Sequence, residues 1–176
     1  LFLPFAAGVV ISAGIASQLL PRFGPRWVTF TGFVMAVIGM SLYIRLTPES
    51  TYVSGILPSI ILMSLGMGLI FVPLSATALY GVGDHDAGVA SAVLNTAQQI
   101  GGSIGVAFLN TIAASATAAF VVANNLQQPN ADALVEGFTT TFMWSTAILA
   151  FAGLVWVVLV RISKKDLSKN DVAAQF

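Results

Sequence analysis

Three amide side chains recur along one face of a long apolar stretch in the second half of the sequence. Asn95, Gln99 and Asn110 are spaced so that, with Gly102 and Val106, they stack in one row of an α-helix. A carboxamide both donates and accepts hydrogen bonds and carries no charge. The row could therefore hydrogen-bond the uncharged parts of varied small molecules, or it could hold a neighbouring helix. We favour the first interpretation, in which the row lines a cavity.

An earlier apolar stretch carries a second row of small and polar residues. Ser64, Gly68 and Ser75 fall within about 40° of one another at 100° per residue. This row predicts either a polar lining of the same cavity or a helix-packing seam, and the spacing supports both equally. With Gln98, which adjoins the amide row, the predicted cavity residues are Ser64, Gly68, Ser75, Asn95, Gln98, Gln99 and Asn110.

A third pattern predicts close packing rather than chemistry. Ala97, Gly101 and Gly105 are four residues apart on a face that adjoins the amide row. Small residues at this spacing let helix backbones approach closely within a membrane. We therefore expect another helix to pack along this seam.

Ionisable groups are absent from the interior of the apolar stretches, which limits the chemistry available there. No Asp, Glu, Lys or His falls within them, whereas a proton relay or a catalytic site in a membrane needs such groups. The chain also has no Cys for a thiolate metal site. We predict no catalytic residue, no bound metal and no cofactor, and hence no enzyme.

His85 is the one histidine, and it lies between Asp84 and Asp86. A metal or proton site can be imagined there. The simpler interpretation is an exposed loop in which one of the two carboxylates caps the helix that begins near Ala87.

Five long apolar stretches must position these residues, at 1–20, 27–46, 55–80, 87–113 and 137–162. Each is long enough to cross a hydrocarbon core, which takes about 20 helical residues. The chain is 57% hydrophobic and only 8% charged, whereas soluble domains carry about 25% charged residues. We predict an all-α membrane protein with five transmembrane helices in residues 1–162, followed by a tail at 163–176.

The fourth stretch continues apolar to Val122, which is too long for one upright crossing. At 1.5 Å per residue its helix would exceed about 50 Å. We expect it to cross the membrane as far as about Ala113 and then to continue or fray outside. The polar residues 124–136 are predicted to form the outer loop that follows.

Basic residues are distributed unevenly between the two sides of the predicted membrane. Arg22 and Arg26 lie between the first two stretches, four basic residues follow the last, and Arg45 alone lies on the opposite side. Because Lys and Arg favour the cytoplasmic side, the N-terminus is predicted outside and the C-terminus in the cytoplasm. The net charge is zero, so no nucleic acid is expected as a partner. The lipid bilayer is the expected partner of the apolar stretches.

Three sequence patterns, together with the tail after the last apolar stretch, resemble the C-terminal part of a major facilitator superfamily transporter, and most closely a bacterial fourteen-helix drug:proton antiporter. The turn Leu19-x-Pro21-Arg22-Phe-Gly24-Pro-Arg26 resembles a degraded copy of the family's cytoplasmic Leu-x-Asp-Arg-x-Gly-Arg-Lys loop, with Pro21 in place of the acid. Within this motif Arg22, Gly24 and Arg26 are retained.

The other two patterns lie in the third and fourth stretches. Leu65-Gly-Met-Gly68 followed by Val72-Pro73 resembles the family's Gly-x-Gly helix with its later proline. The segment from Gly88 to Ala107, with its amides and its Ile-Gly-Gly-Ser-Ile-Gly run, resembles the penultimate helix and is the most specific of the three.

The resemblance implies that these are the last five helices of a longer polypeptide in the bacterial cytoplasmic (inner) membrane. The first helix of the C-terminal bundle and the whole N-terminal half would then be missing partners, which fits an apolar stretch that starts abruptly at Leu1 without Met. The first, third and fourth spans would border a central cavity, and the second and fifth would lie outside. The implied activity is proton-coupled multidrug efflux by alternating access, with an amphipathic drug-like substrate.

Two other functions remain as alternatives. A stand-alone small multi-pass protein, such as a channel subunit or an assembly factor, would fit if the native gene encoded only these residues. A membrane-embedded enzyme would need ionisable groups at membrane depth, and the sequence has none there.

Overall fold

The computed structural model describes residues 3–45, 47, 51–83 and 85–160. Its elements are α1 (Leu3–Phe23), α2 (Pro25–Tyr43), a π-helical turn at Tyr52–Ile56, α3 (Leu57–Ala78), α4 (Ala87–Ala123) and α5 (Ala131–Leu159). All five α-helices are long and apolar enough to cross a membrane, and the described residues form no strand. The predicted all-α membrane fold with five spans is therefore confirmed.

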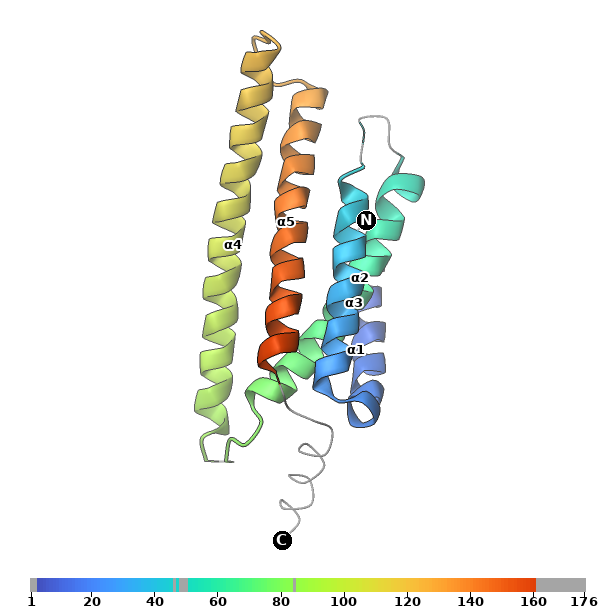
Figure 1. Ribbon diagram of the computed structural model, residues 1–176, viewed down its shortest axis with the longest axis vertical. Coiled ribbons are helices and arrows are strands. Elements are labelled where there is room, and N and C mark those ends of the chain that lie inside the picture. The colour runs from blue at the N-terminus through green and yellow to red at the C-terminus, as the bar shows by residue number, and fades with distance from the viewer. Residues whose placement is uncertain (1–2, 46, 48–50, 84, 161–176) are drawn as a thin grey trace.

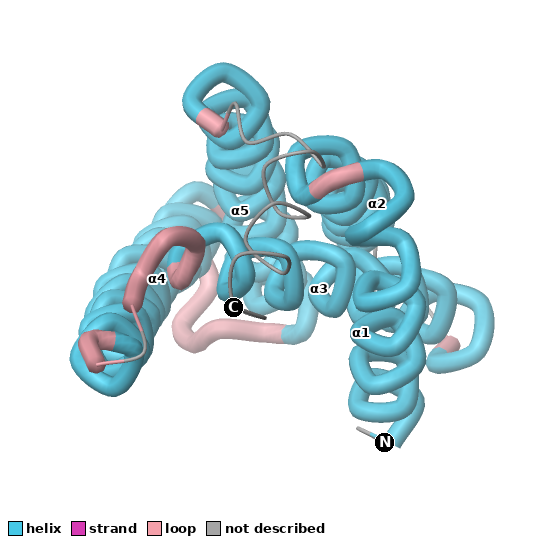
Figure 2. The backbone as a smooth tube through the Cα atoms, turned by 90° about the horizontal axis from the view of Figure 1, so that it is seen from below, coloured by secondary structure: helices cyan, strands magenta, loops and turns pink. Residues whose placement is uncertain are grey.

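Consecutive helices run in opposite directions, as five membrane crossings require (Figure 1). The α1–α2 turn, the α3–α4 connection and the end of α5 lie at one end of the molecule, and the other two connections lie at the opposite end. Seen end-on, α3 lies beside α1 and α2, while α4 stands at the edge of the arrangement (Figure 2). α5 packs between α4 and α2, and α4 barely touches α3.

The α1–α2 connection is shorter than the sequence predicted, because α1 continues through Pro21 to Phe23. Gly24 is the one residue between the two helices, and its φ of 78° is a conformation that glycine adopts without a steric penalty. The Gly24 amide donates to the carbonyl of Leu20 at 2.9 Å. Pro25 then opens α2, where its missing N–H leaves no helical hydrogen bond unmade. The predicted limits at residues 20 and 27 are therefore each a few residues off.

Small residues bring α2 and α3 into backbone contact. A methyl group added at Gly66 would lie 2.7 Å from the Gly32 carbonyl oxygen and 2.8 Å from the Ala36 nitrogen. One added at Gly39 would lie 2.9 Å from the Met63 nitrogen. In lipid, helices associate through close packing of this kind rather than through the hydrophobic effect. The core beside this contact is built from buried Ala16, Val28 and Leu69 of α1, α2 and α3.

Two helix boundaries at the α4–α5 connection differ from the prediction. α4 is one continuous helix of 37 residues to Ala123, so it continues rather than frays. α5 begins at Ala131 and not at residue 137, so the predicted loop 124–136 is wrong in its second half. Asn130 explains the early start, since its side-chain oxygen accepts a hydrogen bond from the Ala133 amide at 2.9 Å.

The prolines of the third span play different parts. Pro58 lies in the first turn of α3, directly after the π-helical turn, and so does not interrupt the interior of the helix. Pro73 is inside α3 and buried. The predicted span from residue 55 to 80 therefore divides into a short π-helical start and a helix that ends at Ala78.

Candidate substrate-binding face

The amide row of α4 is exposed along its whole length. Asn95, Gln99 and Asn110 are exposed, and their side chains make no hydrogen bond to any residue that the structure describes. Gly102 and Val106, which share the row, are exposed as well. An apolar helix that presents unpaired amides must place them against protein, ligand or water, because lipid offers no hydrogen-bond partner.

α5 packs against α4 without burying the amides of the row, which stay exposed. Phe108 meets Trp144 edge-on with ring centres 6.3 Å apart. Nearer the α4–α5 connection, beyond Asn110, Thr117 contacts the bare backbone of Gly137. Gln98 is half-buried, unlike the exposed Gln99 beside it. Among the residues that the structure describes, no α4 residue is buried.

The Asn110 end of the row borders a pocket between α4 and α5. This α4–α5 pocket has a volume of about 550 Å³, within the range of about 300–1,000 Å³ typical of small-molecule sites. Asn110 and Thr117 supply polar groups to an otherwise mainly apolar wall, which includes Leu134 and Phe138. Thr117 was not predicted from the sequence. Its signal was present, since it lies seven residues, about two turns, beyond Asn110 on the same face.

The second predicted row lies elsewhere, in the contact between α1 and α3. Ser64 is fully buried, and its carbonyl accepts a hydrogen bond from the Ser12 hydroxyl at 3.2 Å. A methyl group added at Gly68 would lie 2.7 Å from the Ala13 nitrogen. Ser64 and Gly68 therefore lie at a contact between helices, as the packing interpretation expected. We leave both out of the candidate substrate-binding face.

Ser75 is half-buried on α3. The structure does not bring it together with the amide row, because α3 and α4 barely touch.

The predicted packing seam of α4 faces no described neighbour. Ala97 is exposed, and a methyl group added at Gly101 or Gly105 would meet nothing within 4 Å. The glycines that the structure does place at close helix contacts lie on α1, α2, α3 and α5, and Gly137 of α5 meets α4 at Ala113 and Thr117. The seam at Ala97, Gly101 and Gly105 therefore stays a prediction.

The arginines of the α1–α2 turn are not engaged in ion pairs within the described part of the chain. Arg22 is exposed in the last turn of α1, and Arg26 is half-buried at the start of α2. The Nε atom of Arg26 is buried without a hydrogen-bond partner. Gly24 holds the turn between them, so the three motif residues lie together at one end of the helices.

The His85 loop carries no metal cluster in the residues that the structure describes. His85 Nδ1 lies 3.1 Å from an Asp86 carboxylate oxygen, and both side chains are exposed. Asp86 is the N-cap residue, directly before α4, but its side chain accepts no capping hydrogen bond. The predicted carboxylate cap is therefore wrong for Asp86, and Asp84 lies outside the described residues.

Comparisons with known proteins agree with the helical arrangement. Residues 1–106 match the sequence profile of the Major Facilitator Superfamily. The chain is 40% identical over 164 residues, which are 90% of this chain and 32% of the relative, to the puromycin resistance protein pur8 of Streptomyces alboniger.

Two further relatives carry names of the same kind. The cephamycin export protein CmcT of Amycolatopsis lactamdurans is 37% identical over 66% of this chain and 24% of its own length. The lincomycin resistance protein of Streptomyces lincolnensis is 31% identical over 60% of this chain and 22% of its own. The chain thus spans a third or less of the length of these relatives. With five membrane-spanning helices and a profile match over more than half of its residues, the chain belongs to the Major Facilitator Superfamily.

Proposed function

We propose that this chain forms part of a transporter that exports small amphipathic molecules, and that the amide row of α4 lines the substrate path. The observation that carries the proposal is the exposed row of unpaired amides on a membrane-spanning helix. The names of the relatives support the direction of transport and the substrate class, since they describe antibiotic resistance or export.

The chemistry of the row suits substrates of varied structure. Carboxamides can turn either a donor or an acceptor toward a ligand, and they impose no charge on it. Apolar residues of the α4–α5 pocket would hold the hydrophobic part of the same molecule near Asn110. The substrate would then be recognised mainly by its shape and apolar surface.

Proton coupling in this proposal depends on groups outside the described helices. No Asp, Glu, Lys or His lies in the membrane-spanning part of α1–α4, or beyond the first two turns of α5. We infer that α1–α5 supply a passive wall, against which the rest of the transporter alternates its access. The proposed location is the bacterial inner membrane, with the α1–α2 turn and the C-terminus on the cytoplasmic side.

Replacing each amide by leucine tests the proposal in the native full-length polypeptide. Asn95→Leu, Gln99→Leu and Asn110→Leu remove hydrogen-bonding groups from the proposed path while they keep a helix-forming side chain. Loss of one ligand hydrogen bond, about 0.5–1.5 kcal/mol, corresponds to a two- to tenfold change in affinity. We expect a shift of about that size in the efflux of at least one compound from a panel of amphipathic antibiotics that includes puromycin.

The matched control is Gln128→Leu, which removes an exposed amide from the loop between α4 and α5. Membrane expression of every variant is compared by immunoblot. Unchanged efflux of the whole panel by all three α4 variants would contradict the assignment of the row to the substrate path.

A further inference from the structure

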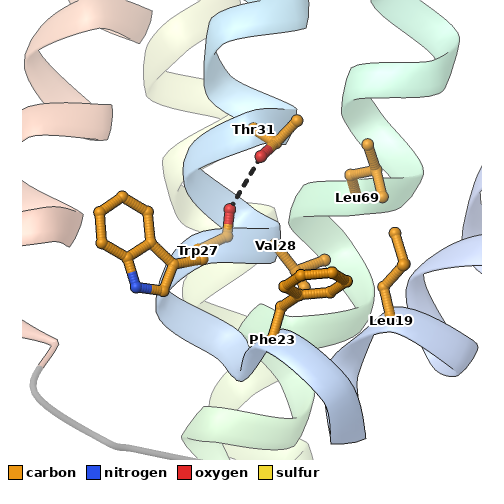
Figure 3. Close-up of a pocket in the computed structure, with 6 residues that line it drawn as sticks. All are labelled: Leu19, Phe23, Trp27, Val28, Thr31 and Leu69. Atoms are coloured by element: carbon orange, nitrogen blue, oxygen red, sulfur yellow. Dashed lines mark hydrogen bonds between the residues drawn. The ribbon is translucent and has the colours of Figure 1, made fainter.

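A small apolar pocket lies beside the α1–α2 turn (Figure 3). This turn pocket has a volume of about 190 Å³ and is lined by Leu19, Phe23, Trp27, Val28, Thr31 and Leu69. Val28 and Leu69 form its buried side. Phe23 and Trp27, about 60% and 59% exposed, stand at its rim.

The shape and polarity of the turn pocket exclude a polar or drug-sized ligand. Its volume is below the range of about 300–1,000 Å³ typical of sites for such molecules. Thr31 offers the one hydroxyl in its wall, and that hydroxyl already donates to the Trp27 carbonyl at 3.0 Å. A thin apolar chain fits both the small volume and the apolar wall of the turn pocket.

The indole of Trp27 places the pocket at the edge of the membrane. Its ring extends outward from α2, and its nitrogen points away from Val28 and Leu69 (Figure 3). Tryptophan favours this depth, where its ring meets acyl chains and its N–H meets the polar head groups. Arg22 and Arg26, the basic residues of the turn beside the pocket, then lie at the level of the head groups.

Among the residues that the structure describes, the charge beside the pocket is positive and uncompensated. Arg22 and Arg26 each adjoin a rim residue, Phe23 and Trp27 respectively, in the chain. Within the described residues neither arginine forms an ion pair, and Arg22 is exposed while Arg26 is half-buried. A phosphate-bearing head group of net negative charge would supply a counter-charge for the two guanidinium groups.

We propose that the turn pocket binds one acyl chain of an anionic phospholipid, whose phosphate lies against Arg22 and Arg26. The apolar slot accounts for the acyl chain, and the two unpaired guanidinium groups account for the anionic head group. Each basic residue near a membrane surface favours an anionic lipid by about fivefold. The pair is expected to give a clear preference over a zwitterionic lipid.

Quenching of Trp27 by brominated lipids tests this directly, because bromine on an acyl chain quenches an indole that it touches. The native full-length polypeptide is placed in phosphatidylcholine vesicles that contain increasing fractions of phosphatidylglycerol with dibrominated acyl chains. A parallel series uses dibrominated phosphatidylcholine. The difference between the unmodified protein and Trp27→Phe isolates the signal of this one indole.

We expect brominated phosphatidylglycerol to reach half-maximal quenching of Trp27 at a membrane fraction at least about five times lower than brominated phosphatidylcholine needs. The double variant Arg22→Gln, Arg26→Gln should lose this preference. The control Arg45→Gln, an exposed arginine at the opposite end of α2, should keep it. Thr31→Phe, which fills the slot from an exposed position, should reduce quenching by both lipids.

Two results would overturn the proposal. Equal quenching by both lipids would show an ordinary lipid-facing surface, and no quenching by either would show that another segment of the polypeptide covers the pocket. If the double arginine variant does not fold, ionic strength replaces it: added salt must weaken the preference in the unmodified protein, because salt screens exposed charges. A preference that salt leaves unchanged also contradicts the proposal.

Discussion

Gly8, Gly32, Gly66 and Gly68 of α1, α2 and α3 lie at helix–helix contacts, whereas the small residues of the α4 seam face no described neighbour. Gly66 meets the Gly32 backbone, and Gly68 meets the backbone of α1. Gly101 and Gly105 of α4 meet nothing within 4 Å. One residue type therefore serves two purposes, and the difference depends on whether a second helix is present. Where a second helix is present, glycine sets the distance between the two backbones. Where none is present, the helix face is available to a partner outside the described residues.

Polar residues differ between the two regions in the same way. Ser12 and Ser64 are buried and joined by a hydrogen bond between α1 and α3. Asn95, Gln99 and Asn110 of α4 are exposed and unpaired within the described residues. A buried serine that is satisfied by a neighbouring helix is a structural group. An exposed amide row on a membrane-spanning helix needs a partner, which is why we assign it to the substrate path.

The largest effect is expected for Gly66→Leu, which tests the packed side of this comparison. A side chain there would enter the space of the Gly32 carbonyl and of Ala36, and backbone cannot move aside as a flexible side chain can. Overpacking typically costs about 1–3 kcal/mol, and contact with backbone places this variant at the upper end or beyond. We expect loss of monodisperse protein in size-exclusion chromatography of the full-length polypeptide.

Gly14→Leu is the control for that experiment, since a methyl group at Gly14 meets nothing within 4 Å. It should express and migrate normally. If Gly66→Leu behaved like the control, the close α2–α3 contact would be wrong.

Gly101→Leu tests the open side of the comparison. If a helix beyond the described residues packs on the α4 seam, a leucine side chain would stand where that backbone belongs. We expect a folded protein whose efflux is reduced at least about tenfold, measured by drug accumulation in cells. Normal efflux with normal expression would show that the seam at Ala97, Gly101 and Gly105 is not a packing surface.

The number and order of the spans followed from the distribution of residues along the sequence, because nearly all charged residues lie between five long apolar stretches. The ends were less predictable, since they depend on single side chains. Asn130 starts α5 about two turns early, and Gly24 lets α1 and α2 meet almost without a loop. Neither effect can be read from hydropathy, although an asparagine and a glycine at these positions are recognisable cap and turn residues.

The packing seams were harder to predict than the spans. Gly32, Ala36 and Gly39 are spaced by four and three residues, close to the four and four of the α4 seam, yet only the α4 seam was predicted. Their role depends on the opposing residues of α3, which lie about 30 positions away in the chain. Likewise, the spacing of Ser64, Gly68 and Ser75 could not distinguish a cavity from a contact, because both need small residues on one face.

Gly137→Ala is expected to have a moderate effect, confined to the α4–α5 pair. The added methyl group would contact the Thr117 hydroxyl and lie 2.8 Å from the Ala113 carbonyl oxygen. The hydroxyl can rotate away but the carbonyl cannot, so a destabilisation of about 1–3 kcal/mol is expected. Hydrogen exchange should quicken in α4 and α5 and stay unchanged in α1–α3. Gly102→Ala, which meets no neighbour within 4 Å, is the control and should leave exchange unaltered.

The smallest effect is expected for Ser12→Ala, which removes the hydrogen bond from α1 to the Ser64 carbonyl. Hydrogen bonds between membrane helices contribute about 0.6 kcal/mol on average, because the separated helices find other partners. The Ser12 hydroxyl also lies 3.1 Å from the Val9 carbonyl of its own helix, so its contribution to the α1–α3 contact is shared. A fall in thermal stability close to the detection limit is therefore expected, and Ser17→Ala, which removes a bond only within α1, should give none. A large loss in Ser12→Ala would mean that buried serines, and not the glycines beside them, hold α1 against α3.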